Sequence, residues 1–186
     1  MIVRFAKTGE TKFIDFREIA PKGANPDMWD VDKKGEVISD DKEFGGKSIG
    51  LPGSVKGFLY VLEKYGNLDR KAVIQPAIDL ANNGYRVSAI MNMDMKNQMN
   101  NILKYPATAK IYLKNGKPYN VGDLLKNPDL AKTMEKIVKD GEKAFYEGEV
   151  AEAIVKATVA AKGKMTLEDL KNYKIKISDP VKGTYR

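Results

Sequence analysis

The chain has 186 residues, of which 42% are hydrophobic and 31% charged, values ordinary for one globular domain with a sizeable core. It contains neither histidine nor cysteine, which excludes Ser-His triads, Cys-His pairs, disulfides and histidine or thiolate metal ligands within this chain. No apolar run approaches the roughly 20 residues that a membrane-spanning helix needs. We therefore predict a single domain over residues 1–186 with no internal boundary and no membrane span.

The net charge of +7 raises the question of nucleic-acid binding. Such binding usually requires basic residues gathered on one face or groove, often with aromatic side chains for base stacking. Here the lysines are spread along the chain and alternate with Asp and Glu. We interpret the charge as a solvated surface and predict no nucleic-acid partner, with a basic binding module as an alternative.

Residues 1–18 resemble a β-hairpin. Apolar residues at Ile2 and Phe5, and again at Phe13 and Ile14, flank a Gly9-containing turn. The segment starts directly in this alternation and has no signal-peptide pattern. We expect either a cytosolic protein or a natural N-terminus that has been removed.

An arginine stands at the end of the second predicted strand, in a chain with few arginines and many lysines. The guanidinium of Arg17 carries five donors in a rigid fork that fits a carboxylate in bidentate fashion. Pro21 disfavours helix at Ala20 and keeps the following segment extended. The pattern predicts a receptor for a carboxylate or phosphate, and the alternative is an ion pair with Asp15, Glu18 or another acid that pins the strand.

Residues 22–50 are polar and contain glycine, which indicates a long loop. Asp27, Asp30 and Asp32 alternate there, but the central glycine and terminal glutamate of a calcium-binding loop are missing. We predict no metal site and no cofactor.

A glycine-containing turn, residues 51–57, leads into a helix for which Ser54 is the expected N-cap and Gly66 the expected end. A glycine-rich turn before a helix can cradle phosphate, but neither common phosphate-loop spacing is present. We expect Gly53 and Gly57 to permit close backbone packing.

Helices alternate with turns through the middle of the chain, and their start and stop residues follow from capping chemistry. Methionines partly at helical spacing are expected in the core, namely Met91, Met93, Met95 and Met99. The predicted features are a short helix at 69–74, a second helix starting with Pro76 and ending at Gly84, a helix capped by Ser88 through 104, a turn at Asn115-Gly116, a helix at 128–140 capped by Asn127, and a helix from Gly148 to Gly163.

Thr166 and Asp169 have the spacing of a capping box for a short last helix. Residues 174–177 and 181–185 then return to a strand pattern. The closing strand pattern runs to Arg186 without a polar tail, so we expect the chain to be cut from within a larger domain.

Several of these segments, in this order, resemble the gamma-glutamyltransferase (gamma-glutamyl transpeptidase) family. The resemblance extends over essentially the whole chain, and the ordered set is more specific than any one motif. The matching segments are 13–21 (FIDFREIAP), 51–57 (LPGSVKG), 64–66 (KYG), 75–81 (QPAIDLA), 122–123 (GD), 129–131 (DLA), 145–148 (FYEG), 165–170 (MTLEDL) and Tyr173.

The resemblance implies an α+β, mainly helical fold, a fragment of the αββα sandwich of N-terminal nucleophile hydrolases. Such an enzyme is made as one precursor that cleaves itself into a large and a small subunit. The new N-terminal threonine of the small subunit attacks gamma-glutamyl amides such as glutathione, and the acyl group passes to water or to an amino acid or peptide. This chain then corresponds to a single partial domain, an internal part of the large subunit.

On this resemblance, Arg17 binds the alpha-carboxylate of the donor and Glu18 orients the arginine, so both are predicted substrate-binding residues. No catalytic residue is predicted here, and the fragment alone is expected to be inactive. The implied partners are the gamma-glutamyl donor, the rest of the large subunit and the small catalytic subunit, and the family suggests a periplasmic or secreted location. A cephalosporin acylase-type or poly-gamma-glutamate-processing relative is the nearest alternative.

Overall fold

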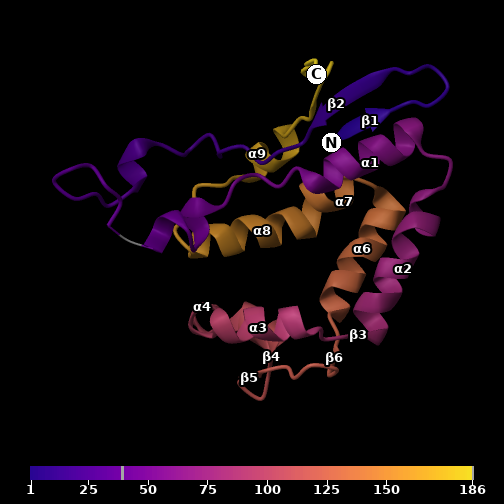
Figure 1. Ribbon diagram of the computed structural model, residues 1–186. Helices are drawn as coiled ribbons and strands as arrows, with labels where there is room; N and C mark the ends of the chain where they lie inside the picture. Colours follow the sequence, from indigo (N-terminus) through magenta and orange to yellow (C-terminus); the bar gives the residue numbers. More distant parts are fainter. Residues whose placement is uncertain (39, 186) are drawn as a thin grey trace. The chain divides into compact units, whose positions relative to one another are not determined.

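The computed structural model describes residues 1–38 and 40–185 (Figure 1). The chain divides into two compact units, one formed by Met1–Asp69 with Lys139–Arg186 and the other by Arg70–Val138. Each unit contains its own clusters of buried apolar side chains. The expected single partial domain without an internal boundary stays a prediction.

The first unit contains an antiparallel sheet with strand order β1-β2-β7. Its strands are β1 (Ile2–Arg4), β2 (Thr11–Asp15) and β7 (Lys176–Ser178). Ile2 pairs with Phe13, which confirms the predicted N-terminal hairpin, and Ile14 pairs with Ile177. The central strand β2 therefore ends directly before the predicted site.

The strand predicted over residues 181–185 is wrong, because these residues have no regular structure. Val181 and Tyr185 are fully exposed. Their apolar side chains have no surface to pack on, and apolar alternation alone does not make a strand without a pairing partner.

Four helices complete the first unit: α1 (Ser54–Tyr65), α7 (Lys143–Tyr146), α8 (Gly148–Ala160) and α9 (Leu167–Asn172). The predicted capping box of α9 is confirmed, since Thr166 Oγ1 accepts from the Asp169 N–H (3.1 Å) and Asp169 Oδ2 accepts from the Thr166 N–H (3.0 Å). The buried cluster of this unit is formed by Leu51, Tyr146, Ala151, Met165, Leu170 and Tyr173.

Helix α1 begins differently from the prediction. Gly53, not Ser54, is the N-cap residue, and no side chain caps the helix. A Cβ at Gly53 would lie within 3.0 Å of the Phe16 carbonyl oxygen, and one at Gly57 within 3.0 Å of the Phe16 ring. The start of α1 is thus set by close packing on the end of β2, as expected for both glycines.

The described part of the long segment before α1 contains the short 3-10 turns η1 (Pro26–Met28), η2 (Asp40–Lys42) and η3 (Gly46–Ser48), together with isolated antiparallel bridges between Ile19 and Leu51 and between Val31 and Val37. Asp32 accepts the N–H groups of Lys34 and Glu36 and so closes a turn. The Gly46 N–H donates to the Ala161 carbonyl (3.0 Å), which joins η3 to the end of α8 (Figure 1).

The second unit pairs helices α2 and α6 and adds three short helices and two small strand pairs. Its helices are α2 (Arg70–Asn83), α3 (Ala89–Asn97), α4 (Met99–Lys104), α5 (Pro106–Tyr112) and α6 (Pro128–Asp140), the last two residues of α6 belonging to the first unit. The strand pairs are β3 (Tyr85–Arg86) with β6 (Leu124–Leu125), and β4 (Leu113–Lys114) with β5 (Lys117–Pro118).

The predicted break between two helices at Pro76 is wrong, because Pro76 lies inside the continuous helix α2. A proline in a helix interior costs about 3 kcal/mol. Burial offsets this cost, since Ile78 and Ala81 pack with Ala131 of α6, which runs beside α2 (Figure 1). The end at Gly84 is confirmed by its positive φ of 93°.

Several local signals in the second unit are confirmed. Ser88 Oγ accepts from the Met91 N–H (3.1 Å) and Asn127 Oδ1 from the Leu130 N–H (3.1 Å), so both are N-caps. Asn115 and Gly116 have positive φ values of 54° and 75°, as a tight hairpin turn requires.

The helix predicted from Ser88 to residue 104 is divided at Gln98 into α3 and α4. Met95 is buried in the core as expected, whereas Met93 is 53% exposed. None of the helices in residues 1–38 and 40–185 combines the length and apolar character that a membrane crossing requires.

Candidate functional site

Arg17 lies two residues beyond the end of β2 and is held through its backbone. Its N–H donates to Asp15 Oδ1 (3.0 Å), and its carbonyl accepts from the Tyr173 hydroxyl (2.9 Å). The preceding Phe16 ring packs edge-on against Phe58 of α1, with 5.3 Å between ring centroids. The position of the Arg17 Cα is therefore fixed from both sides of the peptide chain.

The Arg17 side chain extends into solvent, with 82% of it exposed. Its Nε lies 3.4 Å from Glu18 Oε1, and the described residues supply no second carboxylate to the guanidinium. An exposed pair of this kind contributes about 0–1 kcal/mol. Of the ion pairs given as the alternative, the described contacts include the one with Glu18 but none with Asp15, whose carboxylate accepts the Arg17 backbone N–H.

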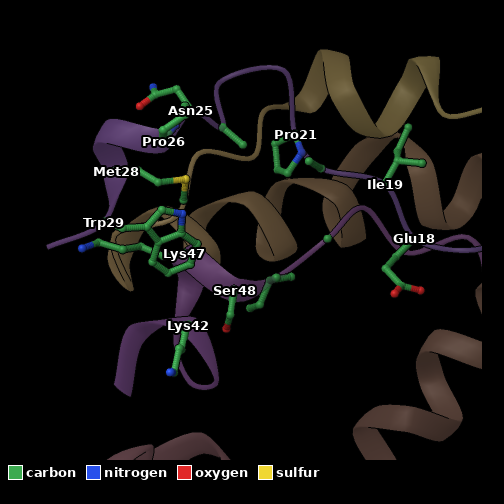
Figure 2. Close-up of a pocket in the computed structure, with 14 residues that line it drawn as sticks. Glu18, Ile19, Pro21, Asn25, Pro26, Met28, Trp29, Lys42, Lys47 and Ser48 are labelled. Atoms are coloured by element: carbon green, nitrogen blue, oxygen red, sulfur yellow. The ribbon is translucent and has the colours of Figure 1, made fainter. Parts of the chain in front are cut away.

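A cavity of about 570 Å³ begins at Glu18 and extends toward η1 and η3. Figure 2 shows the Met28 sulfur beside the Trp29 ring, with Pro21 nearby and Glu18 at the far end. Apolar side chains thus form much of its wall, and this surface can accommodate an apolar group close to Glu18, whereas Arg17 is not among the lining residues.

Two lysines also line this cavity, and they differ in their environment. Lys42 is exposed, whereas the Lys47 side chain is only 15% exposed and lies 2.8 Å from Asp41 Oδ2 and 4.0 Å from Asp30 Oδ2. The hydrogen bond to Asp41 is the main cause that raises the pKa of Lys47. Lys47 is therefore charged and already engaged in the loop structure.

Sequence reasoning missed the buried network behind Arg17. The rings of Tyr173 and Tyr146 are stacked (6.0 Å between centroids, 5° between planes), and the Tyr146 hydroxyl donates to the Pro52 carbonyl (2.7 Å). Lys56 Nζ donates to the Tyr173 carbonyl (3.0 Å) and lies 4.9 Å from the centre of the Tyr146 ring. The only sequence signal was the presence of Phe145-Tyr146 and Tyr173 among the matching segments.

Both tyrosines of this network are only 2% exposed. Burial, followed by the nearby carboxylates of Asp15 and Glu18, raises the pKa of Tyr173, and burial raises the pKa of Tyr146 to about 12. Both phenols are therefore protonated near neutral pH and act as donors.

Among the described residues, no group of three or more His, Cys, Asp or Glu side chains is arranged to hold a metal ion.

The fold is that of part of an N-terminal nucleophile hydrolase. The structure matches the gamma-glutamyltranspeptidase of Helicobacter pylori with a TM-score of 0.94 and 40% identity, covering 100% of this chain and 53% of that one. It matches the Bacillus anthracis transpeptidase CapD with a TM-score of 0.77 and 34% identity, covering 100% of this chain and 54% of that one. The expected α+β fold is thereby confirmed.

The profile of the gamma-glutamyltranspeptidase family matches residues 1–186, and the chain belongs to this family. It is 37% identical over 187 residues to the glutathione hydrolase proenzyme of Escherichia coli, covering 100% of this chain and 32% of that protein. The chain thus spans 32% of the length of this curated relative. The predicted family resemblance is confirmed, and the substrate-binding roles of Arg17 and Glu18 stay predictions.

Proposed function

We propose that this chain is part of a gamma-glutamyltransferase that cleaves gamma-glutamyl amides such as glutathione and transfers the glutamyl group to water or to an amino acid or peptide. Within it, Arg17 binds the alpha-carboxylate of the donor, and Glu18 orients the guanidinium through Nε. The observation that carries the proposal is the combination of a fixed backbone at Arg17 with a side chain that is 82% exposed.

The nucleophile belongs to a segment outside these residues, a threonine at the N-terminus of the small subunit. Its own amine can act as the base for its hydroxyl, so the reaction needs no histidine. The hydroxyl attacks the gamma-carbonyl carbon, the amine of the donor leaves with a proton, and water or an acceptor amine then takes the acyl group. The alpha-carboxylate is unchanged throughout, so Arg17 contributes to donor binding and orientation and not to bond breaking.

This role predicts a particular kinetic signature for Arg17→Lys in the full-length, processed enzyme. Lysine keeps the charge but loses the bidentate fork, and a hydrogen bond between charged groups is worth about 1.5–3 kcal/mol. The donor KM should therefore rise by about 10- to 100-fold, with kcat much less affected. Measurement of gamma-glutamyl-p-nitroanilide turnover gives both constants.

Arg4→Lys is the matched control, since Arg4 is an exposed arginine at the end of β1, the strand that pairs with β2. It should leave both constants unchanged. If Arg17→Lys lowers thermal stability and leaves the donor KM at the value of the unmodified enzyme, Arg17 is a structural residue and the proposed role is wrong.

A poly-gamma-glutamate-processing relative is the second candidate, and the likeness to the Bacillus anthracis transpeptidase CapD, a capsule biosynthesis protein, is the observation weighed for it. The higher TM-score and identity to the Helicobacter pylori enzyme favour the first candidate. Assays of the full-length enzyme with glutathione and with poly-gamma-glutamate, at matched concentrations of gamma-glutamyl units, distinguish the two.

A further inference from the structure

The hydroxyl of Tyr173 is the only side-chain group in the described residues that bonds the Arg17 carbonyl. Tyr173 is 2% exposed, so this bond lies at the inner side of the site. It joins residues separated by 156 positions in the sequence. A buried hydrogen bond of this kind fixes the segment after β2 to the core of the first unit.

Tyr173 is itself held rigidly. Its ring stacks on Tyr146, its N–H donates to the Leu170 carbonyl (3.2 Å), and its carbonyl accepts from Lys56 Nζ (3.0 Å). The residue directly follows α9, whose start is fixed by the capping box. The hydroxyl therefore has little freedom to follow Arg17 if the latter moves.

The hydrogen bond between the Tyr173 hydroxyl and the Arg17 carbonyl requires that residue 53 has no side chain. A Cβ there would lie within 3.0 Å of both the Phe16 carbonyl oxygen and the Tyr173 hydroxyl. Gly53 has a φ of −104°, a value open to any residue, so the close approach and not the backbone conformation requires glycine here.

We propose that Tyr173 is a positioning residue for the donor carboxylate: its hydroxyl holds the Arg17 backbone so that the exposed guanidinium is presented in one place. This rests on the proposed carboxylate-binding role of Arg17. A clamp on a flexible arm pays an ordering cost when the donor binds, whereas a fixed Cα reduces that cost. Glu18 cannot restrain the Arg17 backbone in this way, because it lies on the same exposed segment and would move together with Arg17.

The experiment uses Tyr173→Phe in the full-length, processed enzyme, with Tyr146→Phe as a matched control. Both changes remove one hydroxyl from the same stacked pair, but the Tyr146 hydroxyl donates to the Pro52 carbonyl and accepts from the Lys56 N–H, whereas the Tyr173 hydroxyl donates to the Arg17 carbonyl. The donors are gamma-glutamyl-p-nitroanilide and 4-aminobutyryl-p-nitroanilide, which lacks the alpha-carboxylate.

Loss of one hydrogen bond predicts that Tyr173→Phe raises the KM of the carboxylated donor by about 3- to 10-fold, with little change in kcat. It should leave kcat/KM of the decarboxylated donor unchanged. Tyr146→Phe should lower the melting temperature at least as much as Tyr173→Phe does, because its hydroxyl makes two hydrogen bonds instead of one, and it should not change the KM or kcat of either donor. A purely structural role predicts the same kinetic effect from both variants, or equal losses for both donors, and either result overturns the proposal.

Arg17→Lys separates this proposal from the one on which it rests. If Arg17→Lys weakens only the carboxylated donor and Tyr173→Phe weakens neither, positioning by Tyr173 is wrong and the carboxylate clamp stands. If Arg17→Lys also leaves both donors unchanged, the clamp itself is wrong.

If the Tyr173→Phe precursor does not cleave itself into the two subunits, an enzyme with 2,3-difluorotyrosine at position 173 replaces it in the experiment. This residue keeps both the hydroxyl and the stacked ring. Its phenol is more acidic, so it loses its donor proton at lower pH than tyrosine. The carboxylated donor's KM should rise as this phenol ionises, while the unmodified enzyme shows no such rise. Absorbance measures the ionisation of the fluorinated phenol. If the KM of the carboxylated donor stays equal to that of the unmodified enzyme while the phenol ionises, the proposal is refuted.

Discussion

Gly57→Ala provides a strong test of how α1 supports the site, because local and tertiary effects have opposite signs. Alanine in a helix interior is favoured over glycine by about 1 kcal/mol. However, the new Cβ would lie within 3.0 Å of Cβ, Cγ and Cδ1 of Phe16. Phe16 is bonded directly to Arg17 and its ring also packs on Phe58, so the ring cannot move without moving the site.

Overpacking of this kind costs about 1–3 kcal/mol, which exceeds the gain in helix propensity. We expect Gly57→Ala to destabilise the full-length enzyme by about 1–2 kcal/mol and to raise the donor KM. Differential scanning fluorimetry and gamma-glutamyl-p-nitroanilide kinetics measure the two effects.

The control for Gly57→Ala is the same change in a Phe16→Ala background. Phe16→Ala removes the ring contacts but keeps the Cβ of residue 16, which would lie 2.6 Å from the new methyl group. The change should therefore be less destabilising in this background than in the unmodified enzyme, because the overlap with the ring no longer opposes the helix preference. An increase in melting temperature on Gly57→Ala in the unmodified background would show that Phe16 is free to move, and the reasoning would be wrong.

Two further predictions follow from the capping box and from the location of the nucleophile. Burial raises the pKa of Asp169, but hydrogen bonds from Thr166 and from the Lys22 N–H outweigh it and lower the pKa below 3.8. This carboxylate therefore stabilises the fold above its unfolded pKa, and the contribution disappears as pH falls through the lower folded value. Asp169→Asn should lower the melting temperature at pH 7 by an amount that shrinks below about pH 3.8, and a constant difference down to pH 2 contradicts this. Separately, this chain alone should release no p-nitroaniline from gamma-glutamyl-p-nitroanilide, and turnover at ordinary enzyme rates would place a nucleophile within it.

The elements that sequence reasoning predicted well are those whose chemistry is local. Ser88 and Asn127 cap helices because their side-chain oxygens accept from an N–H three residues ahead. The capping box of α9 and the positive φ values at Asn115-Gly116 are likewise decided within four residues. Such signals do not depend on the rest of the fold.

The errors occur where distant packing outweighs a local preference. Pro76 should end a helix, but α2 continues because Ile78 and Ala81 are buried against Ala131, about 50 residues away. Ser54 has the side chain of an N-cap, but the start of α1 is fixed by the contact of Gly53 with the end of β2. Neither partner can be identified from the neighbouring sequence.

The candidate site combines both situations in a few residues. The guanidinium of Arg17 indicates carboxylate recognition from its chemistry alone, and the order of the surrounding motifs places it in a family. Its usefulness as a clamp depends on where its Cα is held, and that is decided by Asp15 two residues away and by Tyr173 at the other end of the chain. The sequence around Tyr173 gives no local sign of its proposed positioning role. That role depends on Gly53, far away in the sequence, which leaves room for the Tyr173 hydroxyl. The proposed binding residue could therefore be named from the sequence, whereas the residue that we propose positions it required the structure.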